Sequence, residues 1–384
     1  MQVVILANAP GALIELCGIT LLERLLRTLQ RVGVRAAVVI SETPETIEAE
    51  LRKDSPPRSE IAVKIVGRAL RLPKIGATEE VSLQSDLRLT LPGDAVWDPR
   101  LLQLLLAQTE PCQLLNIGEP TGATVSRSDA QPIRALEIAE QPTYSLTMRR
   151  HLPLLFIPMP NEDAERRILD AAQKGSQDLP ALVHAPIETL LVGHLCKTRI
   201  TPNELTGFCN LVAWMTAILF AFGYLVAGTL CALAIGVLDG LDGKQARVKV
   251  ETSEAGKLEH WFDTFFELAW AIALAFHFYH SGALPRAWWY LLLLLAAEGV
   301  DGLAKLSVIR RYGRLIDELT PLDRRIRLLG GRRNIYVWIL AIGLIVGAPA
   351  RAFVVIAWWE VVSALIHVAR ATWVTMVRPL QLSP

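Results

Sequence analysis

The sequence predicts an α/β domain with a mostly parallel sheet, followed by an all-α membrane domain with six transmembrane helices. Short apolar runs, frequent prolines and ordinary charge fill residues 1–200, whereas nearly all the long apolar runs follow Pro202. Of the 384 residues, 52% are apolar, and the mean hydropathy is +0.35. A chain of this length has room for two domains. We therefore predict a cytoplasmic domain at 1–180, a juxtamembrane helical linker at 181–204 and a membrane domain at 205–384.

Strand and helix patterns alternate in the first half of the chain. Such alternation is typical of a parallel sheet covered by helices. The predicted elements are strands at 2–8, 35–41 and 61–67, helices at 19–32 and 43–53, and helices within 160–200, of which 186–198 lies along the cytoplasmic membrane surface.

Six apolar runs in the second half are each near the ~20 residues that a helix needs to cross the hydrocarbon core. Basic residues gather in the loops on one side, with eight arginines in 310–333, while the opposite loops carry only Arg286 and Arg351. The positive-inside rule then predicts that both termini lie in the cytoplasm. The predicted spans are 205–226, 227–247, 257–280, 286–308, 333–349 and 352–376.

Charge and cysteine content exclude several classes of protein. The net charge of +1 gives no reason to expect a nucleic acid partner. The five cysteines show no CxxC spacing, so neither a zinc site nor a disulfide framework is indicated. The first residues, MQVVILANAPGALIEL, have no basic start and no small-residue cleavage site, so we expect no signal peptide.

Acidic residues appear where the second and third apolar runs approach the cytoplasm. No charged residue lies between Glu204 and Asp239, and Asp242 follows Asp239 on the same helix face. Glu259 and Asp263 are spaced i, i+4 at the start of the next run. Ionisable groups in a membrane span point to function, and carboxylates on neighbouring helices are ligands for hard divalent cations. We predict a site for one or two Mg²⁺ or Mn²⁺ ions.

The pattern Asp239-x2-Asp242-Gly243-x2-Ala246-Arg247-x8-Gly256, followed by two helically spaced acids, resembles the signature of the CDP-alcohol phosphotransferases. Thr201-Pro202-Asn203-Glu204-Leu205-Thr206 resembles the segment that precedes the first span in that family. The resemblance covers residues 195–384. It implies a six-helix membrane enzyme that moves a phospho-alcohol group from a CDP-alcohol to an acceptor hydroxyl and releases CMP, in phospholipid or polar-headgroup synthesis.

The chain departs from the family pattern after Gly256. The pattern continues Gly-x3-Asp-x3-Asp, and strict counting reaches His260 and Thr264. A shift by one residue reaches Glu259 and Asp263, whose carboxyl groups the chemistry needs. We adopt the shifted register, because one linker residue is easily lost whereas a His/Thr pair cannot replace two carboxylates.

The resemblance implies a role for each matching residue. Four carboxylates hold the metal ions that clamp the diphosphate. Asp263 also serves as general base, and Arg247 pairs with a phosphate as a fork donor. The implied metal ligands are Asp239, Asp242, Glu259 and Asp263, and the implied substrate-binding residues are Asn203, Gly240, Gly243, Ala246, Arg247 and Gly256.

Two charged regions allow two interpretations each. The arginines of 310–333 fit the positive-inside signal and attraction to anionic lipid. They also fit a phosphate pocket for an anionic acceptor, such as an inositol phosphate or glycerol phosphate, formed mainly by Arg332 and Arg333. In the fourth span, Asp301 and Lys305 form either an acceptor site or a simple neutralising pair.

The first half bears a second resemblance, to the sugar-nucleotidyltransferase or cytidylyltransferase domains, in VVILAN…GITLLERLLRTLQRVGV…AVVIS and in the strand that ends at Asp94. Those domains open with a phosphate loop that holds glycine and arginine and is followed by lysine. Here the stretch from Ala7 to Glu15 has no basic residue, and the first is Arg24. Such a loop cannot cradle a triphosphate well. We expect a degenerate, inactive domain that packs on the cytoplasmic face of the spans, in a homodimer.

Two other functions are compatible with the sequence. One is a non-catalytic membrane scaffold with a degenerate nucleotidyltransferase domain. The other is a prenyltransferase-type membrane enzyme with paired Asp-rich motifs, although such motifs lack the Gly-x2-Ala-Arg continuation. Metal-dependent CMP release from a CDP-alcohol separates the predicted enzyme from the scaffold.

Overall fold

The structure, a computed structural model, describes residues 1–53, 60–67, 87–127, 134–141, 144–145, 150–151, 154–173, 178–251 and 256–377. It divides into two compact units. The first contains the described residues up to Gln173 together with Val192–Arg199 and the described residues from Lys244 to Glu251. The second contains the remaining described residues. The end of one long helix therefore belongs to the first unit, while its beginning belongs to the second.

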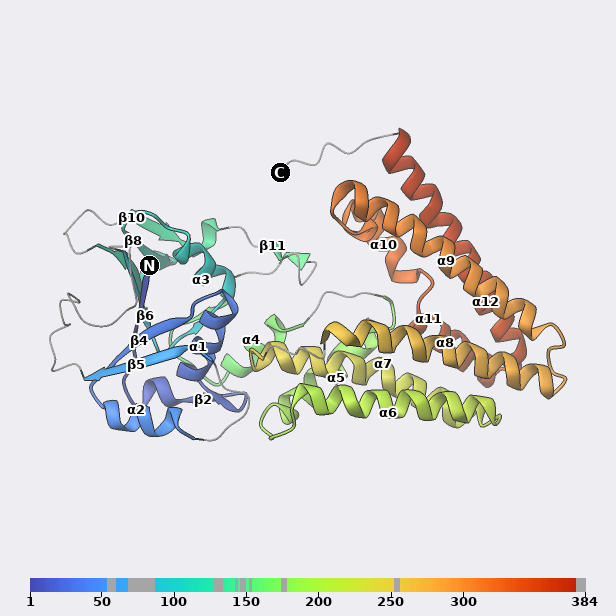
Figure 1. Ribbon diagram of the computed structural model, residues 1–384, viewed down its shortest axis with the longest axis horizontal. Helices are drawn as coiled ribbons and strands as arrows, with labels where there is room; N and C mark the ends of the chain where they lie inside the picture. Colours follow the sequence, from blue (N-terminus) through green and yellow to red (C-terminus); the bar gives the residue numbers. More distant parts are fainter. Residues whose placement is uncertain are drawn as a thin grey trace. The chain divides into compact units, whose positions relative to one another are not determined.

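A mixed sheet forms the centre of the first unit (Figure 1). Its described strands run in the order β10-β8-β9-β6-β1-β4-β5. The pairs β5–β4, β4–β1, β1–β6 and β8–β10 are parallel, and β9 runs antiparallel to both neighbours. The parallel part confirms the predicted α/β pattern. The strands are β1 (Gln2–Leu6), β4 (Ala36–Ser41), β5 (Ala62–Gly67), β6 (Arg88–Pro92), β8 (Cys112–Asn116), β9 (Glu119–Ser126) and β10 (Arg134–Glu137).

The core of the first unit lies between this sheet and its helices. Leu22, Leu25, Leu26 and Leu29 of helix α1 (Leu21–Arg31) are fully buried and belong to one cluster with Ile5 of the sheet. Thr20 caps α1 by accepting a hydrogen bond from the Glu23 backbone. The other elements of this part of the chain are helices α2 (Pro44–Leu51), α3 (Pro99–Leu106) and α4 (Ala164–Ala171), short helical turns η1 (Gly11–Leu13) and η2 (Ile138–Glu140), and strands β2 (Glu15–Leu16), β3 (Ile19–Thr20), β7 (Val96–Trp97), β11 (Tyr144–Ser145), β12 (Arg150–His151) and β13 (Phe156–Ile157).

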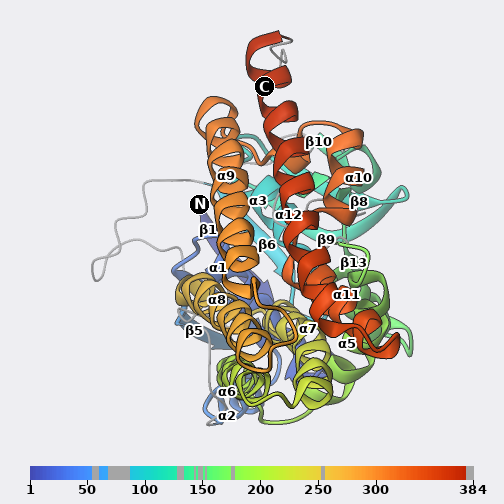
Figure 2. The same ribbon diagram turned by 90° about the vertical axis from the view of Figure 1, so that its right-hand side faces the viewer.

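Helices make up the second unit. Two long ones, α9 (Ala287–Tyr312) and α12 (Pro349–Thr372), lie side by side (Figures 1 and 2). Aromatic and small residues fill its core, among them Ala213, Phe220, Trp270 and Phe353. Small side chains let helices approach closely. The helices are α5 (Ala181–Leu195), α6 (Pro202–Ala221), α7 (Leu225–Val248), α8 (Gly256–His280), α9 (Ala287–Tyr312), α10 (Pro321–Leu329), α11 (Arg333–Ile345) and α12 (Pro349–Thr372), with the turns η3 (Ile316–Glu318) and η4 (Trp373–Val377).

A helix lies at each of the six predicted spans. Among the described residues, α6, α7 and the stretch Pro349–Met376 are long and apolar enough to cross a membrane. The pair α10 and α11, bent by 41°, makes a fourth candidate if it is one span. α9 has 26 residues, but Glu298, Asp301 and Lys305 interrupt its apolar surface. The structure thus has three to four candidate spans among the described residues, and the count of six stays a prediction.

Candidate active site

Three helices meet at the two acids of α7. Thr206 of α6 donates a hydrogen bond from Oγ1 to Asp242 Oδ2 at 2.6 Å. Arg333, the first residue of α11, donates from Nη2 to Asp239 Oδ2 at 2.7 Å. A capping box of Thr201 and Glu204 begins α6 and sets the start of the helix that carries Thr206. The Thr-Pro-Asn-Glu-Leu-Thr segment thus both starts α6 and supports Asp242.

Arg333 lies among opposite charges and an aromatic ring. Its Nη1 is 3.5 Å from Glu267 Oε1, and its guanidinium carbon is 5.0 Å from the centroid of the Phe266 ring. Its side chain is only 10% exposed. Arginine suits such a place, because its planar group pairs with carboxylates and stacks on rings at once. Arg333 therefore joins α7, α8 and α11 at this site.

The predicted metal ligands fall into two groups. Asp239 and Asp242 lie three residues apart on α7, where Asp239 accepts a bond from Arg333 and Asp242 accepts bonds from Thr206 and from the Gly243 backbone. The side chains of Glu259 and Asp263, and of His260, lie outside the described residues, as does the space around Gly256. Within the described part of the chain no group of three or more His, Cys, Asp or Glu residues could hold a metal ion. The two described donors are carboxylates, the ligand type that Mg²⁺ and Mn²⁺ prefer.

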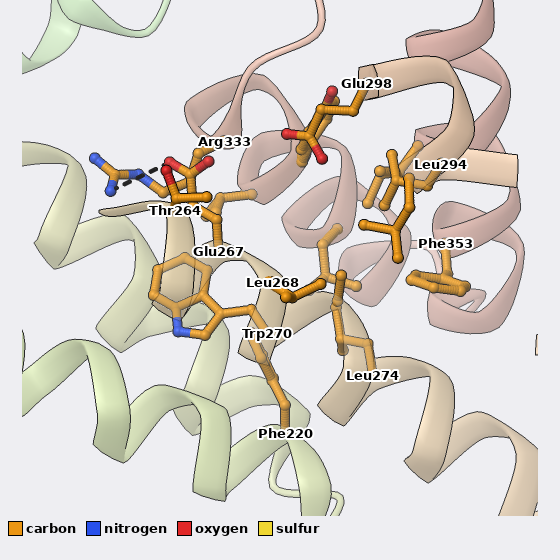
Figure 3. Close-up of a pocket in the computed structure, with 16 residues that line it drawn as sticks. Phe220, Thr264, Glu267, Leu268, Trp270, Leu274, Leu294, Glu298, Arg333 and Phe353 are labelled. Carbon is orange, nitrogen blue, oxygen red and sulfur yellow. Dashed lines mark ion pairs between the residues drawn. The ribbon is translucent and has the colours of Figure 1, made fainter. Parts of the chain in front are cut away.

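A cavity of about 250 Å³ lies beside this site, within the second unit (Figure 3). Most of its wall is apolar, with Phe220, Leu294 and Phe353 among the lining residues. Arg333 and Glu267 line it too, and Figure 3 shows them as an ion pair next to Thr264. Arg333 thus lines this cavity and also bonds Asp239 of α7.

Buried polar groups connect α9, α11 and α12 near the cavity. Asp301 pairs with Lys305 at 2.5 Å and with His367 Nδ1 at 2.5 Å. The Tyr336 hydroxyl donates to Glu360, which is buried. The neutralising pair of Asp301 and Lys305, one of the two interpretations from sequence, is therefore present, with His367 as an additional partner that spacing alone did not reveal.

Several arginines of 310–333 are engaged in ion pairs. Arg327 bonds Asp317, and Arg332 Nη2 is 3.7 Å from the same carboxylate. Arg324 and Arg325 are exposed in α10. The phosphate-binding role of Arg332 and Arg333 stays a prediction, and both side chains already have acidic neighbours.

The far end of α7 belongs to the first unit. Lys244 and Gln245 are fully buried there. Arg247 donates from Nε to the Ala172 carbonyl at 2.7 Å, so part of its guanidinium is held by the protein backbone. Its contact with a phosphate stays a prediction, as do the roles of Asn203, Gly243 and Ala246.

Gly240 lies against the buried side chain of Glu188 in α5. A Cβ atom added to Gly240 would lie 2.3 Å from Glu188 Oε1 and 2.5 Å from Cδ. Real Cβ atoms essentially never come this close, so either the carboxylate or the helix would have to move. Helix packing thus explains why position 240 is glycine. The substrate contact predicted from the resemblance is a separate reason.

We expect Gly240→Ala to lower the free energy of unfolding by about 1–3 kcal/mol, the usual cost of overpacking. Thermal unfolding of the purified protein, followed by tryptophan fluorescence, measures it. Gly299→Ala in α9 is the matched control, since a Cβ there meets nothing within 4 Å. That variant should be neutral or stabilised by up to about 1 kcal/mol. Equal stability of the two variants would contradict the packing of Glu188 on α7.

Comparison with known proteins assigns this helical region. Residues 199–366 match the family model described as CDP-alcohol phosphatidyltransferase. These residues form a CDP-alcohol phosphatidyltransferase domain. The match includes α6 to α11, most of α12, and the signature from Asp239 to Gly256. With the three to four candidate spans, it makes the chain an integral membrane protein.

Curated relatives are similar over part of their length. A protein of Aquifex aeolicus (strain VF5) named bifunctional IPC transferase and DIPP synthase is 27% identical over 199 residues, which are 51% of this chain and 45% of the relative. Its namesake in Rubrobacter xylanophilus is 31% identical over 159 residues, 41% of this chain and 34% of the relative. The chain thus matches less than half the length of each.

A solved structure is also similar. It is the Mycobacterium tuberculosis phosphatidylinositol phosphate synthase with CDP-DAG bound, which is 20% identical to this chain. The match covers 53% of this chain and 100% of the solved chain, with a TM-score of 0.38. The assignment of the CDP-alcohol phosphatidyltransferase domain is based on the family match and on the signature residues.

Proposed function

We propose that this protein is a metal-dependent membrane transferase that moves a phospho-alcohol group from a CDP-alcohol to an acceptor hydroxyl and releases CMP. The observation that carries the proposal is that Thr206 of α6 bonds Asp242 and Arg333 of α11 bonds Asp239, so that three helices meet inside the matched domain. Carboxylates held by neighbouring side chains at a helix face suit a charged diphosphate bound through divalent cations.

In the proposed reaction the acceptor oxygen attacks the phosphorus that carries the alcohol. A new P–O bond forms, the bond from this phosphorus to the oxygen bridging to CMP breaks, and CMP leaves with the electron pair. Asp263 takes the proton of the acceptor hydroxyl. Mg²⁺ or Mn²⁺ bound by Asp239, Asp242, Glu259 and Asp263 would neutralise the charge of the diphosphate.

The cavity beside Arg333 suits a substrate with both a polar and an apolar part. Its wall offers apolar side chains for hydrocarbon, while Thr264, Glu298 and Tyr336 offer polar groups. We propose that one substrate carries a lipid chain, in phospholipid or polar-headgroup synthesis. The proposal includes the domain limits predicted from sequence, six spans, cytoplasmic termini and a homodimer.

The decisive experiment is CMP release by the purified full-length protein. CDP-diacylglycerol and soluble CDP-alcohols serve as donors, each with several polar hydroxyl acceptors, including inositol phosphate and glycerol phosphate. We expect release with Mg²⁺ or Mn²⁺ and its loss when the metal is chelated. Release from no donor at any metal concentration would favour the non-catalytic scaffold.

The relatives are named as bifunctional, and we propose that this chain keeps only the membrane reaction. The loop that corresponds to a nucleotidyltransferase phosphate loop contains Pro10 and the turn η1. Asn8 Oδ1 already accepts a hydrogen bond from the Glu42 backbone, and a Cβ on Gly11 would lie 3.3 Å from Asp94 Cβ. The loop thus has internal contacts and no cation of its own for a triphosphate.

We therefore expect the first unit not to bind Mg-CTP in the micromolar range, which corresponds to about −8 kcal/mol. Calorimetry on the full chain carrying Asp239→Asn and Asp242→Asn measures this with the membrane site disabled. Micromolar binding that Asp94→Ala abolishes would show a working nucleotide site in the first unit and a bifunctional protein.

A further inference from the structure

The C-terminal end of α7 is capped by side chains of α1. The last carbonyls of a helix have no partner inside the helix, and a buried carbonyl without a partner is costly. Arg24, only 4% exposed, donates from Nη1 to the Val248 carbonyl and from Nη2 to the Leu16 carbonyl at 2.8 Å. One guanidinium thus joins the end of α7 to the β2–β3 hairpin. All these residues lie in the first unit.

A second arginine one turn along α1 continues this cap. Arg27, 5% exposed, donates from Nη1 to the Lys249 carbonyl at 3.0 Å and pairs with Glu251 Oε1 at 3.2 Å. Its Nε bonds Glu23 Oε1 at 2.8 Å, which fixes the guanidinium from the other side. Burial lowers the pKa of Arg24 to about 10, so that Arg24 is charged at neutral pH.

Side chains on the same end of α7 bond the first unit in return. Lys244 Nζ donates to Gln173 Oε1 at 2.6 Å, and Lys249 Nζ donates to the Thr198 carbonyl at 3.0 Å. The arginine cap therefore belongs to a set of contacts that holds residues 244–251 from several directions. Asp242 lies two residues before Lys244 on this helix.

Two physical effects make the arginine cap strong. Cations are favoured at a helix C-terminus, where the backbone dipoles leave partial negative charge. Hydrogen bonds from charged donors are stronger than those between neutral groups, and here they lie away from water. Removing Arg24 would leave the buried Val248 carbonyl without its donor and would release the last turn of α7.

We propose that Arg24 and Arg27 are positioning residues for the transferase reaction: the first unit caps α7 and thereby holds the helix that carries Asp239 and Asp242. The nucleotidyltransferase-like unit thus serves the membrane reaction without chemistry of its own. The proposal rests on the proposed function only where its test uses activity, because the cap itself is a property of the fold.

The test uses the full-length protein with Arg24→Met, Arg24→Lys and Arg27→Met. Arg31→Met is the control, an exposed arginine in the last turn of the same helix. Hydrogen–deuterium exchange reports on the amides of 239–251. Manganese binding without substrate and the Mg²⁺ concentration for half-maximal CMP release report on the acids.

We expect Arg24→Met to speed exchange in 239–251 and to raise the half-maximal Mg²⁺ concentration by about tenfold. Arg24→Lys should lie between Arg24→Met and the wild type, because lysine keeps a cation but reaches one carbonyl only. Arg27→Met should act in the same direction, and Arg31→Met should match the wild type. A role in folding alone would reduce the active fraction without changing the metal dependence.

Unchanged exchange in Arg24→Met and Arg27→Met, or a lower rate at unchanged metal dependence, would overturn the proposal. If Arg24→Met does not fold, Arg24→Lys and Arg27→Met decide by the same readouts. A wild-type protein that releases no CMP would refute the proposed function, whereas exchange and manganese binding would still decide whether the cap positions α7.

Discussion

Replacing Asp239 or Asp242 by asparagine is expected to reduce CMP release by at least about a hundredfold, the scale on which an electrostatic contact to the reacting groups acts. Asparagine keeps the shape of the side chain but removes the charge that a divalent cation needs. At Asp242 the amide oxygen can still accept the bond from Thr206, so the meeting of α6 and α7 should survive. At Asp239 the bond from Arg333 becomes weaker without its charge.

Initial rates with saturating CDP-alcohol over a range of Mg²⁺ concentrations measure this effect, and thermal unfolding verifies that each variant is folded. Asp94→Asn, an acid of the first unit, is the control and should keep wild-type turnover. If both variants retain more than about a tenth of wild-type turnover, far above the expected loss, these carboxylates do not hold the catalytic metal.

The main elements of both units could be predicted because they follow simple periodicities. The alternation of apolar runs indicated β1, α1 and β4, and each begins within two residues of its predicted start. The spans were visible as long apolar runs. Strands of two residues, such as β2 and β7, have no period to detect.

Only local features of the site could be predicted. Asp239 and Asp242 share a face because they are three residues apart on one helix. The partners of these acids come from elsewhere: Arg333 is 94 residues from Asp239, and Thr206 is 36 residues from Asp242. The resemblance pointed to the segment of Thr206, and the arginine-rich stretch 310–333 pointed to Arg333, but neither indicated these contacts. No local pattern links two such residues, because tertiary packing alone brings them together.

The arginine cap shows the same limit and one usable signal. Arg24 is 224 residues from Val248, so spacing says nothing of their contact. Yet α1 is buried on nearly every side of its middle turns, and Arg24 and Arg27 lie among the buried leucines. A helix with charged residues inside its apolar surface must bring them to buried acceptors. Such arginines therefore indicate a docked partner even where the partner is unknown.

The second large effect is expected in α8. Glu259→Gln and Asp263→Asn should each reduce CMP release by about a hundredfold or more, if the shifted register is correct. α8 is helical from Gly256 to His280, so residues at i, i+4 and i+8 follow one stripe. Glu267 ends the stripe that starts at Glu259, and its carboxylate lies 3.5 Å from the arginine that bonds Asp239. We therefore expect Glu259 and Asp263 to face the acids of α7 as well.

The competing register uses His260 and Thr264. Helical spacing places Thr264 about 60° from Glu267 around the axis and Asp263 about 40° from it. The difference is small, so chemistry decides: a hydroxyl and an imidazole are poor ligands for Mg²⁺, whereas carboxylates are good ones. His260→Ala and Thr264→Ala should accordingly keep CMP release within about fivefold of the wild type, a far smaller effect than the loss of a metal ligand.

Rates of the four single variants at saturating donor, each with its Mg²⁺ dependence, compare the registers directly. Inactivity of the His260 and Thr264 variants beside active Glu259 and Asp263 variants would make the strict family count correct and the shifted register wrong.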